Sequence, residues 1–261
     1  MPVLLTPPVL HMPTHEAEAV VLRQYSLSDS DLIIIMITRE YGKIRATAPG
    51  AKKPKSRLGA CLEPLTRIRL EYSSREGRDL VQIRQAELVH SYLGNNRSLE
   101  KMCVFSYFAE IVNEIVQDNQ ANYTLYRLLL AALDSGEQMT RFLPLVRYFE
   151  IWCLRLSGLF PNYAYCSNCG KCVKDEGFFA WLEAGQSRCW ECAQGRGLRI
   201  GKEAAGALEA IAKLSPGQFG SKPLGKEAAQ ELERLSQRLL EMHLEKRFKS
   251  YRIMTEALQE M

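Results

Sequence analysis

Four cysteines in the second half of the sequence have the spacing of a metal site. Cys166 and Cys169 form one C-x-x-C pair, Cys189 and Cys192 form a second, and nineteen residues separate the two pairs. This spacing is typical of zinc sites with four thiolate ligands, and the segment between the pairs is long enough for a hairpin. Four thiolates complete the tetrahedron and leave no position for an activated water. The spacing therefore predicts a structural zinc ion that does not take part in catalysis.

Other uses of these thiols stay open from the sequence. Cys166, Cys169 and Cys172 together resemble the start of an iron–sulfur motif, but the remainder of that motif is missing. The cysteines could also be metal-free or paired by oxidation. The three remaining cysteines stand among apolar residues and are expected in the core; they are Cys61, Cys103 and Cys153.

No other residues suggest catalysis. His243 and Glu245 have the H-x-E form of zinc deaminases, but they follow the cysteines instead of preceding them. The phosphate-binding loops G-x-x-x-x-G-K-[ST] and G-x-G-x-x-G are absent from the sequence, which argues against an ATPase or a dinucleotide enzyme. We therefore predict a binding protein. A metal-dependent nucleic-acid enzyme is the competing hypothesis, for which the sequence offers no obvious carboxylate cluster.

Cations are concentrated in one segment of a chain whose net charge is only +4. Residues 43–57 contain no acidic residue and six basic ones: Lys43, Arg45, Lys52, Lys53, Lys55 and Arg57. Prolines and a glycine in the second part of this segment favour an exposed loop. Such a loop could simply keep the protein soluble, because charge runs are usually solvated. It could also bind the phosphates of a nucleic acid.

The residues around this loop have the alternating pattern of strands. Apolar and polar residues alternate over residues 43–48 and 67–72, which predicts strands with one polar face. The aliphatic run at residues 32–37 predicts a strand buried on both sides, and residues 20–25 and 80–86 supply two more strands. Alternation places three pairs on polar strand faces, which are Lys43 with Arg45, Arg67 with Arg69, and Gln82 with Arg84. If these strands are neighbours, one basic wall adjoins the loop. A five-stranded barrel with such a wall resembles the OB-fold, which binds single-stranded nucleic acid.

Aromatic residues accompany the cations at two places. Tyr41, in a turn, is the exposed candidate for stacking on a base. Tyr72 lies on the same strand face as Ile68 and Leu70 and is therefore expected in the core. Residues 246–252 form a second basic patch with two interleaved aromatic residues. Cations at the end of a helix also complement the helix dipole, so this patch is more simply explained as structural.

The remaining sequence predicts an α+β protein with three parts. The proline-rich residues 1–15 are expected to form a flexible extension, and residues 16–91 an OB-fold β-barrel that binds nucleic acid. Residues 98–261 are expected to form a helical domain with an embedded four-cysteine, zinc-ribbon-like element at residues 166–192. The predicted helices begin near Ser98 and include residues 142–156, 204–214 and 227–249. The longest aliphatic run, residues 32–37, is far below the roughly 20 residues of a membrane helix, so we expect a cytoplasmic protein.

The order of these parts resembles the bacterial RecO recombination-mediator family from about residue 14 onward. The segments that carry the resemblance are residues 42–44, 49–57, 149–158 and 249–252 and the first cysteine pair. The resemblance implies binding to single- and double-stranded DNA, annealing of complementary strands, and a nucleoid-associated location. It also implies cooperation with RecR and with the acidic, apolar C-terminal tail of single-stranded DNA-binding protein in loading RecA.

The candidate DNA contacts follow from this resemblance and from strand parity. The match to the family's segments implies contacts at Lys43, Arg45, Lys52, Lys53, Lys55 and Arg57. Alternation along the strand adds Arg67 and Arg69, which lie on a polar strand face. Some relatives lack the cysteines, so zinc is expected to support the helical domain. The alternative function is a zinc-stabilised RNA-binding or transcription-linked adaptor with the same barrel.

Overall fold

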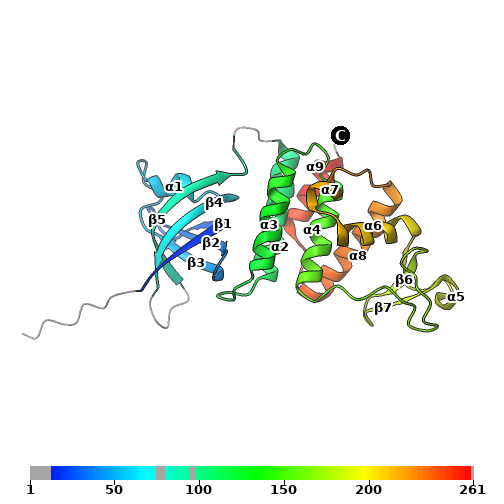
Figure 1. Ribbon diagram of the computed structural model, residues 1–261. Coiled ribbons are helices and arrows are strands. Elements are labelled where there is room, and N and C mark those ends of the chain that lie inside the picture. The colour runs from blue at the N-terminus through cyan, green and yellow to red at the C-terminus, as the bar shows by residue number, and fades with distance from the viewer. Residues whose placement is uncertain (1–12, 75–79, 95–97, 260–261) are drawn as a thin grey trace, which may run out of the picture. The chain divides into compact units, whose positions relative to one another are not determined.

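The computed structural model describes residues 13–74, 80–94 and 98–259, which fold as two compact units (Figure 1). The first unit contains the chain up to Ser91 together with the short segment Asp118–Ala121. The second unit contains Tyr92–Gln117 and the chain from Asn122 onward. The sequence predicted that all of residues 98–261 belong to the helical domain, so the place of Asp118–Ala121 in the first unit differs from that expectation.

The first unit is a five-stranded β-structure that closes into a barrel in the order β1-β2-β3-β5-β4. Neighbouring strands are antiparallel except for β3 and β5, which pair in parallel over three residues. The strands are β1 (Thr14–Ser26), β2 (Leu32–Thr38), β3 (Gly42–Ala48), β4 (Thr66–Ser73) and β5 (Leu80–Ser91). The predicted five strands are therefore confirmed, and a short helix that was not predicted, α1 (Arg57–Cys61), connects β3 to β4.

Alternation along the strands builds the core of the barrel. In β3 the side chains of Ile44, Ala46 and Ala48 are buried, and in β4 those of Ile68 and Leu70 are buried. Because successive residues of a strand point to opposite faces, Arg45 and Arg69, which alternate with these residues, are exposed. This is the face that the alternating pattern predicted to be polar.

The start of β1 differs from the predicted flexible extension of residues 1–15. Residues 1–12 lie outside the described residues. Thr14 and His15 belong to β1, where they pair with Ser73 and Tyr72 of β4. His15 Nε2 lies 3.1 Å from Ser74 Oγ and the His15 ring stacks on Tyr72. Cross-strand pairing therefore orders the chain before the predicted boundary.

The second unit is mainly helical, as predicted. Its longer helices are α2 (Leu99–Ile115), α3 (Tyr123–Gly136), α4 (Leu143–Leu156), α6 (Lys202–Lys213), α8 (Lys226–Leu244) and α9 (Lys249–Gln259). The side chains of Ser98 and Asn122 accept hydrogen bonds from backbone N–H groups in the first turns of α2 and α3, as N-cap residues do. Phe108 of α2 stacks on Phe149 of α4 with ring centroids 4.1 Å apart. None of the helices in the described ranges has the length and apolar character needed to cross a membrane.

The prediction of one helix over residues 227–249 is wrong. Helix α8 ends at Leu244, Glu245 adopts a left-handed conformation with φ of 50°, and α9 begins at Lys249. The buried Glu110 carboxylate accepts a hydrogen bond of 2.9 Å from Ser250 N at the start of α9. Phe248 is buried and its ring contacts Tyr107 of α2. The chain leaves the helical path between Leu244 and Lys249. This break accompanies the burial of Phe248 and the contact of Ser250 N with Glu110.

A buried ion pair lies inside the helical unit. Arg147 and Glu150 of α4 have no exposed surface, and Arg147 Nη1 lies 2.7 Å from Glu150 Oε2. The Glu150 carboxylate also accepts hydrogen bonds from Tyr107, Ser236 and Gln237 at 2.7–2.8 Å. Burial raises the pKa of Glu150, while the Arg147 charge opposes that shift. These contacts connect α2, α4 and α8 through polar groups that water does not reach.

Candidate metal centre and nucleic-acid interface

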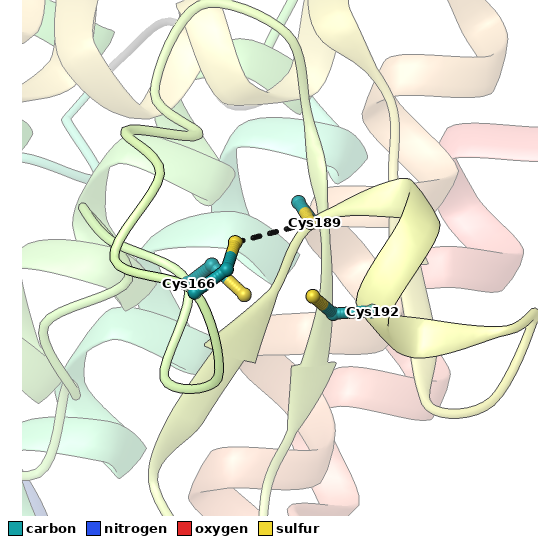
Figure 2. Close-up of side chains that lie close together, drawn as sticks. Cys166, Cys189 and Cys192 are labelled. Atoms are coloured by element: carbon teal, nitrogen blue, oxygen red, sulfur yellow. Dashed lines mark hydrogen bonds between the residues drawn. The ribbon is translucent and has the colours of Figure 1, made fainter.

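The four cysteines of the two C-x-x-C pairs come together in the second unit. The sulfur atoms of Cys166, Cys169, Cys189 and Cys192 all lie within 4.8 Å of one another. Figure 2 shows the side chains of Cys166, Cys189 and Cys192 pointing toward a common centre. Cys166 and Cys189 are buried, Cys192 is half-buried and Cys169 is exposed. The grouping that the spacing predicted is therefore present.

Two tight turns and a hairpin position these cysteines. In the first turn Gly170 N donates to Cys166 O at 2.9 Å, and Gly170 has φ of 72°, a conformation that favours glycine. In the second, Cys189 precedes the short helix α5 (Trp190–Ala193). The strands β6 (Phe178–Trp181) and β7 (Gln186–Arg188) form the expected hairpin between the turns. A further strand, β8 (Leu198–Ile200), pairs with β6 and was not predicted.

The surroundings of the sulfur atoms favour a thiolate at Cys166 and oppose one at Cys169. Burial opposes ionisation of Cys166, but N–H groups of Cys189, Cys169 and Asn168 outweigh burial and lower its pKa to about 6. At Cys169 the Lys171 N–H lowers the pKa, whereas hydrogen bonds with neighbouring thiols raise it to about 12. Asn168 Nδ2 also donates to Cys192 Sγ at 3.3 Å. A metal ligand must be a thiolate, so the four cysteines form a donor set that could bind a metal ion.

The other cysteines and acids form no comparable group. Cys172 is exposed and is not among the four clustered thiols. Cys103 and Cys153 are buried, as expected for core residues, while Cys61 is half-buried. Across residues 13–74, 80–94 and 98–259, the cysteine cluster is the one group of three or more His, Cys, Asp or Glu side chains close enough to hold a metal ion.

The basic loop between β3 and α1 is held against the turn between β1 and β2. Asp31 Oδ1 accepts a hydrogen bond of 2.8 Å from Gly50 N, and Lys52 N donates to Ser30 O at 3.0 Å. Hydrogen bonds from Gly50 and Ser30 lower the pKa of Asp31. Lys52 Nζ donates to Ser26 Oγ at 2.7 Å and to Ser28 O at 2.9 Å. The backbone of the loop is therefore anchored at its start.

Three cations of this loop are available to a ligand. Lys53, Lys55 and Arg57 are exposed. Within the described part of the chain, none of these three side chains forms an ion pair. The predicted exposure of the loop is therefore observed, and its charges face solvent.

The cations of β3 have a different environment because they contact Asp118. Lys43 Nζ lies 3.1 Å from Asp118 Oδ1, and Arg45 Nε lies 2.9 Å from Asp118 Oδ2. Asn119 N donates to Lys43 O at 2.8 Å, which places this segment beside β3. Lys43 is buried, although alternation predicted an exposed position. The Asp118 carboxylate therefore pairs with both cations of β3.

The cations of β4 are also paired with carboxylates. Arg67 Nη2 lies 2.7 Å from Glu18 of β1, and Arg69 Nη1 lies 3.6 Å from Glu87 of β5. Strands β3, β5 and β4 are neighbours, as the predicted basic wall required. Exposed cations lie on all three strands at Arg45, Arg84 and Arg69, so the predicted basic wall is present in part. Its charge is reduced because carboxylates pair with the cations of β3 and β4. Sequence reasoning missed these acids because their partners depend on the register between strands.

Tyr41 and Tyr72 lie as predicted, and Lys246 and Arg247 of the second basic patch form ion pairs. Tyr41 is 38% exposed and Tyr72 is 4% exposed. In the second patch Lys246 Nζ lies 2.8 Å from Glu114, and Arg247 Nε lies 3.3 Å from Glu241. The aromatic residues of that patch pack inward, where the Phe248 ring contacts Tyr107.

Two family models match almost the whole chain. The model described as Recombination protein O N terminal matches residues 12–92, which include the barrel strands. The model described as Recombination protein O C terminal matches residues 96–252, which include the cysteine cluster. The two matches meet near the boundary between the two compact units.

Individual relatives agree with these matches. The DNA repair protein RecO of Koribacter versatilis is 30% identical over 235 residues, which cover 89% of this chain and 94% of the relative. The DNA repair protein RecO of Anaeromyxobacter sp. strain K is 32% identical over 242 residues, which cover 91% of this chain and 94% of the relative. The DNA repair protein RecO of Symbiobacterium thermophilum is 31% identical over 247 residues, which cover 92% of this chain and 96% of the relative. The chain belongs to the RecO family, which supports a role in DNA repair and recombination.

Proposed function

We propose that the chain binds single- and double-stranded DNA through the basic loop of the barrel, residues 52–57, and anneals complementary strands. The observation that carries this proposal is the contrast in charge pairing. Lys53, Lys55 and Arg57 are exposed and form no ion pair with the described residues, whereas the cations of β3 and β4 contact carboxylates. Cations without a protein partner can neutralise phosphates with no carboxylate to displace.

The loop would act by lowering the repulsion between two DNA backbones. Lys52 adds a fourth charge, although its ammonium group already donates to Ser26 and Ser28. With three to four phosphate contacts on a single strand, the logarithm of the binding constant should fall with the logarithm of salt concentration with a slope of about −2 to −3. Neutralised strands can approach and pair without nucleotide hydrolysis, so the proposal requires no enzyme activity.

The strand cations are weaker candidates for DNA contact. Lys43, Arg45, Arg67 and Arg69 remain part of the proposed interface because the resemblance and the strand parity suggested them. A phosphate could reach Arg45 or Arg69 only by competing with Asp118 or Glu87. Lys43 is buried as well, so a phosphate would have to displace part of the protein to reach it. We therefore assign the main contribution to the loop.

We infer that the metal bound by the four cysteines is zinc and that it stabilises the helical unit. A tetrahedral site with Zn–S distances of about 2.3 Å has sulfur atoms about 3.8 Å apart. The distance between the sulfur atoms of Cys169 and Cys189 is 3.7 Å. The ligands would be Cys166, Cys169, Cys189 and Cys192. With all four positions taken by thiolates, the ion would connect the two turns to the hairpin and would bind no substrate.

The proposed partners are those that the family resemblance implies. These are RecR, the C-terminal tail of single-stranded DNA-binding protein, and RecA indirectly, in the cytoplasm and at the nucleoid. We propose as the site for this tail a hollow of about 250 Å³ in the helical unit, where the acidic tail would compete with Glu209, which lies 3.8 Å from Lys174 Nζ. Arg155 and Lys174 supply cations there, and Phe160, Tyr163 and Phe178 supply rings. A peptide with the sequence of that tail should bind the protein and lose affinity when Lys174 is replaced by alanine.

Strand annealing tests the proposed function most directly. Two complementary DNA strands are mixed with the protein, without nucleotide, and the rate of duplex formation is measured with and without single-stranded DNA-binding protein. We expect faster annealing with wild type and a large loss when Lys52, Lys53, Lys55 and Arg57 are all replaced by alanine. The matched control replaces four exposed cations of the helical unit, which are Lys202, Lys222, Lys226 and Arg238.

The same assay separates the alternative function. A protein that anneals or binds RNA strands in preference to DNA would be an RNA-binding adaptor, which is the alternative that the sequence left open. Equal loss of annealing in the loop variant and in the control variant would show that total charge, and not the loop, is responsible. That result would contradict the proposal.

A further inference from the structure

A hollow of about 350 Å³ lies at one end of the barrel, formed by residues of the first unit alone. Three rings line it: His15 at the start of β1, Tyr41 in the turn between β2 and β3, and Tyr72 near the end of β4. Ile44 and Val81, both buried, also line it. We call this hollow the aromatic pocket.

The three rings pack against one another. His15 stacks on Tyr72 with centroids 5.2 Å apart and planes 23° apart. Tyr41 stands edge-on to both, at 5.6 Å and 73° from His15 and at 6.1 Å and 88° from Tyr72. Tyr72 is buried while Tyr41 is 38% exposed. Aromatic packing therefore holds the Tyr41 ring in place while leaving part of it open to another planar group.

The polar groups of the aromatic pocket suit a neutral ligand. Its lining includes Glu40, Asn119 and Ser74, whose hydroxyl lies 3.1 Å from His15 Nε2. Glu40 Oε2 also accepts a hydrogen bond of 3.3 Å from Glu18 N. No lysine or arginine is among the described residues that line it. Burial, with the nearby Tyr41 and Glu40, raises the pKa of Tyr72 to about 12, so this phenol stays neutral. Among the described lining residues a phosphate would meet no lysine or arginine, whereas a heterocycle with amino groups would meet a carboxylate and an amide.

We propose that the aromatic pocket receives one unpaired nucleobase of bound DNA, stacked on Tyr41. This inference rests on the proposed function and deepens it, because it adds a contact that only unpaired strands can make. Strand β3 has seven residues and runs from the turn that holds Tyr41 to the basic loop. The pocket and the loop are therefore separated by about 20 Å along the strand. A single strand that follows β3 spans this distance within the roughly 4–16 nucleotides that one OB-fold covers.

Binding to a strand that lacks bases tests the proposal. The affinity of the full-length protein is measured for a single-stranded oligonucleotide, for an abasic strand of the same length, and for a duplex. We expect wild type to prefer the strand with bases. Tyr41→Ala should lose on the order of tenfold in affinity for that strand, with no change for the abasic strand or the duplex. Tyr41→Phe keeps the ring and should retain the wild-type preference.

The control is Tyr25→Ala, because Tyr25 is 46% exposed and lies at the opposite end of β1 from His15. We expect this variant to bind like wild type. Equal affinity of wild type for strands with and without bases would overturn the base pocket while leaving phosphate binding by the loop intact. Failure of wild type to bind any DNA would instead overturn the proposed function. Tighter binding of free adenosine than of the oligonucleotide would assign the pocket to a free nucleoside and overturn the inference.

Discussion

Charged side chains have opposite environments in the two units of the molecule. In the helical unit Arg147 and Glu150 have no exposed surface, form an ion pair, and share hydrogen bonds with side chains from two other helices. In the barrel Lys53, Lys55 and Arg57 are exposed and, among the described residues, form no ion pair. The cations of β3 and β4 are intermediate, because each is paired with a carboxylate on a neighbouring segment.

This difference shows that the number of cations in a segment does not predict which of them are available to a ligand. A buried pair stabilises the arrangement of helices only while both partners are present. An exposed pair contributes little to stability and also leaves little net charge for a phosphate. Among the described residues of the barrel, the loop is where several exposed cations without an ion pair lie together. Arg84 of β5 is exposed as well, but its Nε donates a hydrogen bond to Ser73 Oγ.

The buried pair should give the largest effect on stability. Replacing Glu150 by alanine leaves the Arg147 charge buried without its carboxylate, so we expect the free energy of unfolding to fall by about 3–5 kcal/mol. Chemical denaturation with a two-unit analysis measures this change. The control is Arg238→Ala, an exposed position on α8 that should change the free energy by less than about 0.5 kcal/mol. Similar values for both variants would show that the buried network contributes no more than a surface residue.

Removal of the metal should give the second-largest effect on stability. If zinc is held by the four cysteines at a free concentration about one hundred times its Kd, chelation should lower the stability of the helical unit by about 3 kcal/mol. Cys166→Ser should have a similar effect, and Cys172→Ser, at an exposed position outside the cluster, should not. DNA affinity below the unfolding temperature should stay within about twofold of wild type. Loss of DNA affinity without loss of stability would place zinc in the DNA interface.

The cysteine cluster and the ion pairs differ in how much the sequence reveals. The cluster follows from local spacing, since each pair sits in one turn and the intervening segment is short. Glu18, which pairs with Arg67, is 49 residues away from it, and their contact depends on the register of β1 against β4. Asp118 comes from the segment between α2 and α3, so its contact with Lys43 requires the tertiary fold. The end of α8 was missed because Glu245 and its neighbours include no glycine or proline.

The comparison of loop and strands within the barrel predicts unequal effects on DNA binding. One variant replaces Lys53, Lys55 and Arg57 by alanine, and the other replaces Arg45, Arg67 and Arg69. Both remove three charges, but only the loop cations are without carboxylate partners among the described residues. At a fixed salt concentration we expect the loop variant to lose on the order of tenfold to a hundredfold in affinity for single-stranded DNA. The strand variant should lose about threefold or less; equal losses would contradict the assignment.

The smallest effect should come from Asp118. Asp118→Asn removes the carboxylate that contacts Lys43 and Arg45, and Arg45 is exposed enough to accept a phosphate in its place. We expect affinity for DNA to rise by about twofold to fivefold, since one more cation becomes available. Asp118→Glu keeps the charge and should bind like wild type. A fall in affinity of the folded Asp118→Asn variant would show that this carboxylate supports the interface.

The salt dependence of binding to single-stranded DNA tests the central claim, that the basic loop holds the phosphates. The binding constant is measured for wild type and for the variant with alanine at positions 53, 55 and 57 across a range of salt concentrations. Each lost phosphate contact should reduce the log–log slope by about 0.7, so the variant's slope should be smaller by about 2. A variant that keeps the wild-type slope would show that other cations hold the DNA and would contradict the account.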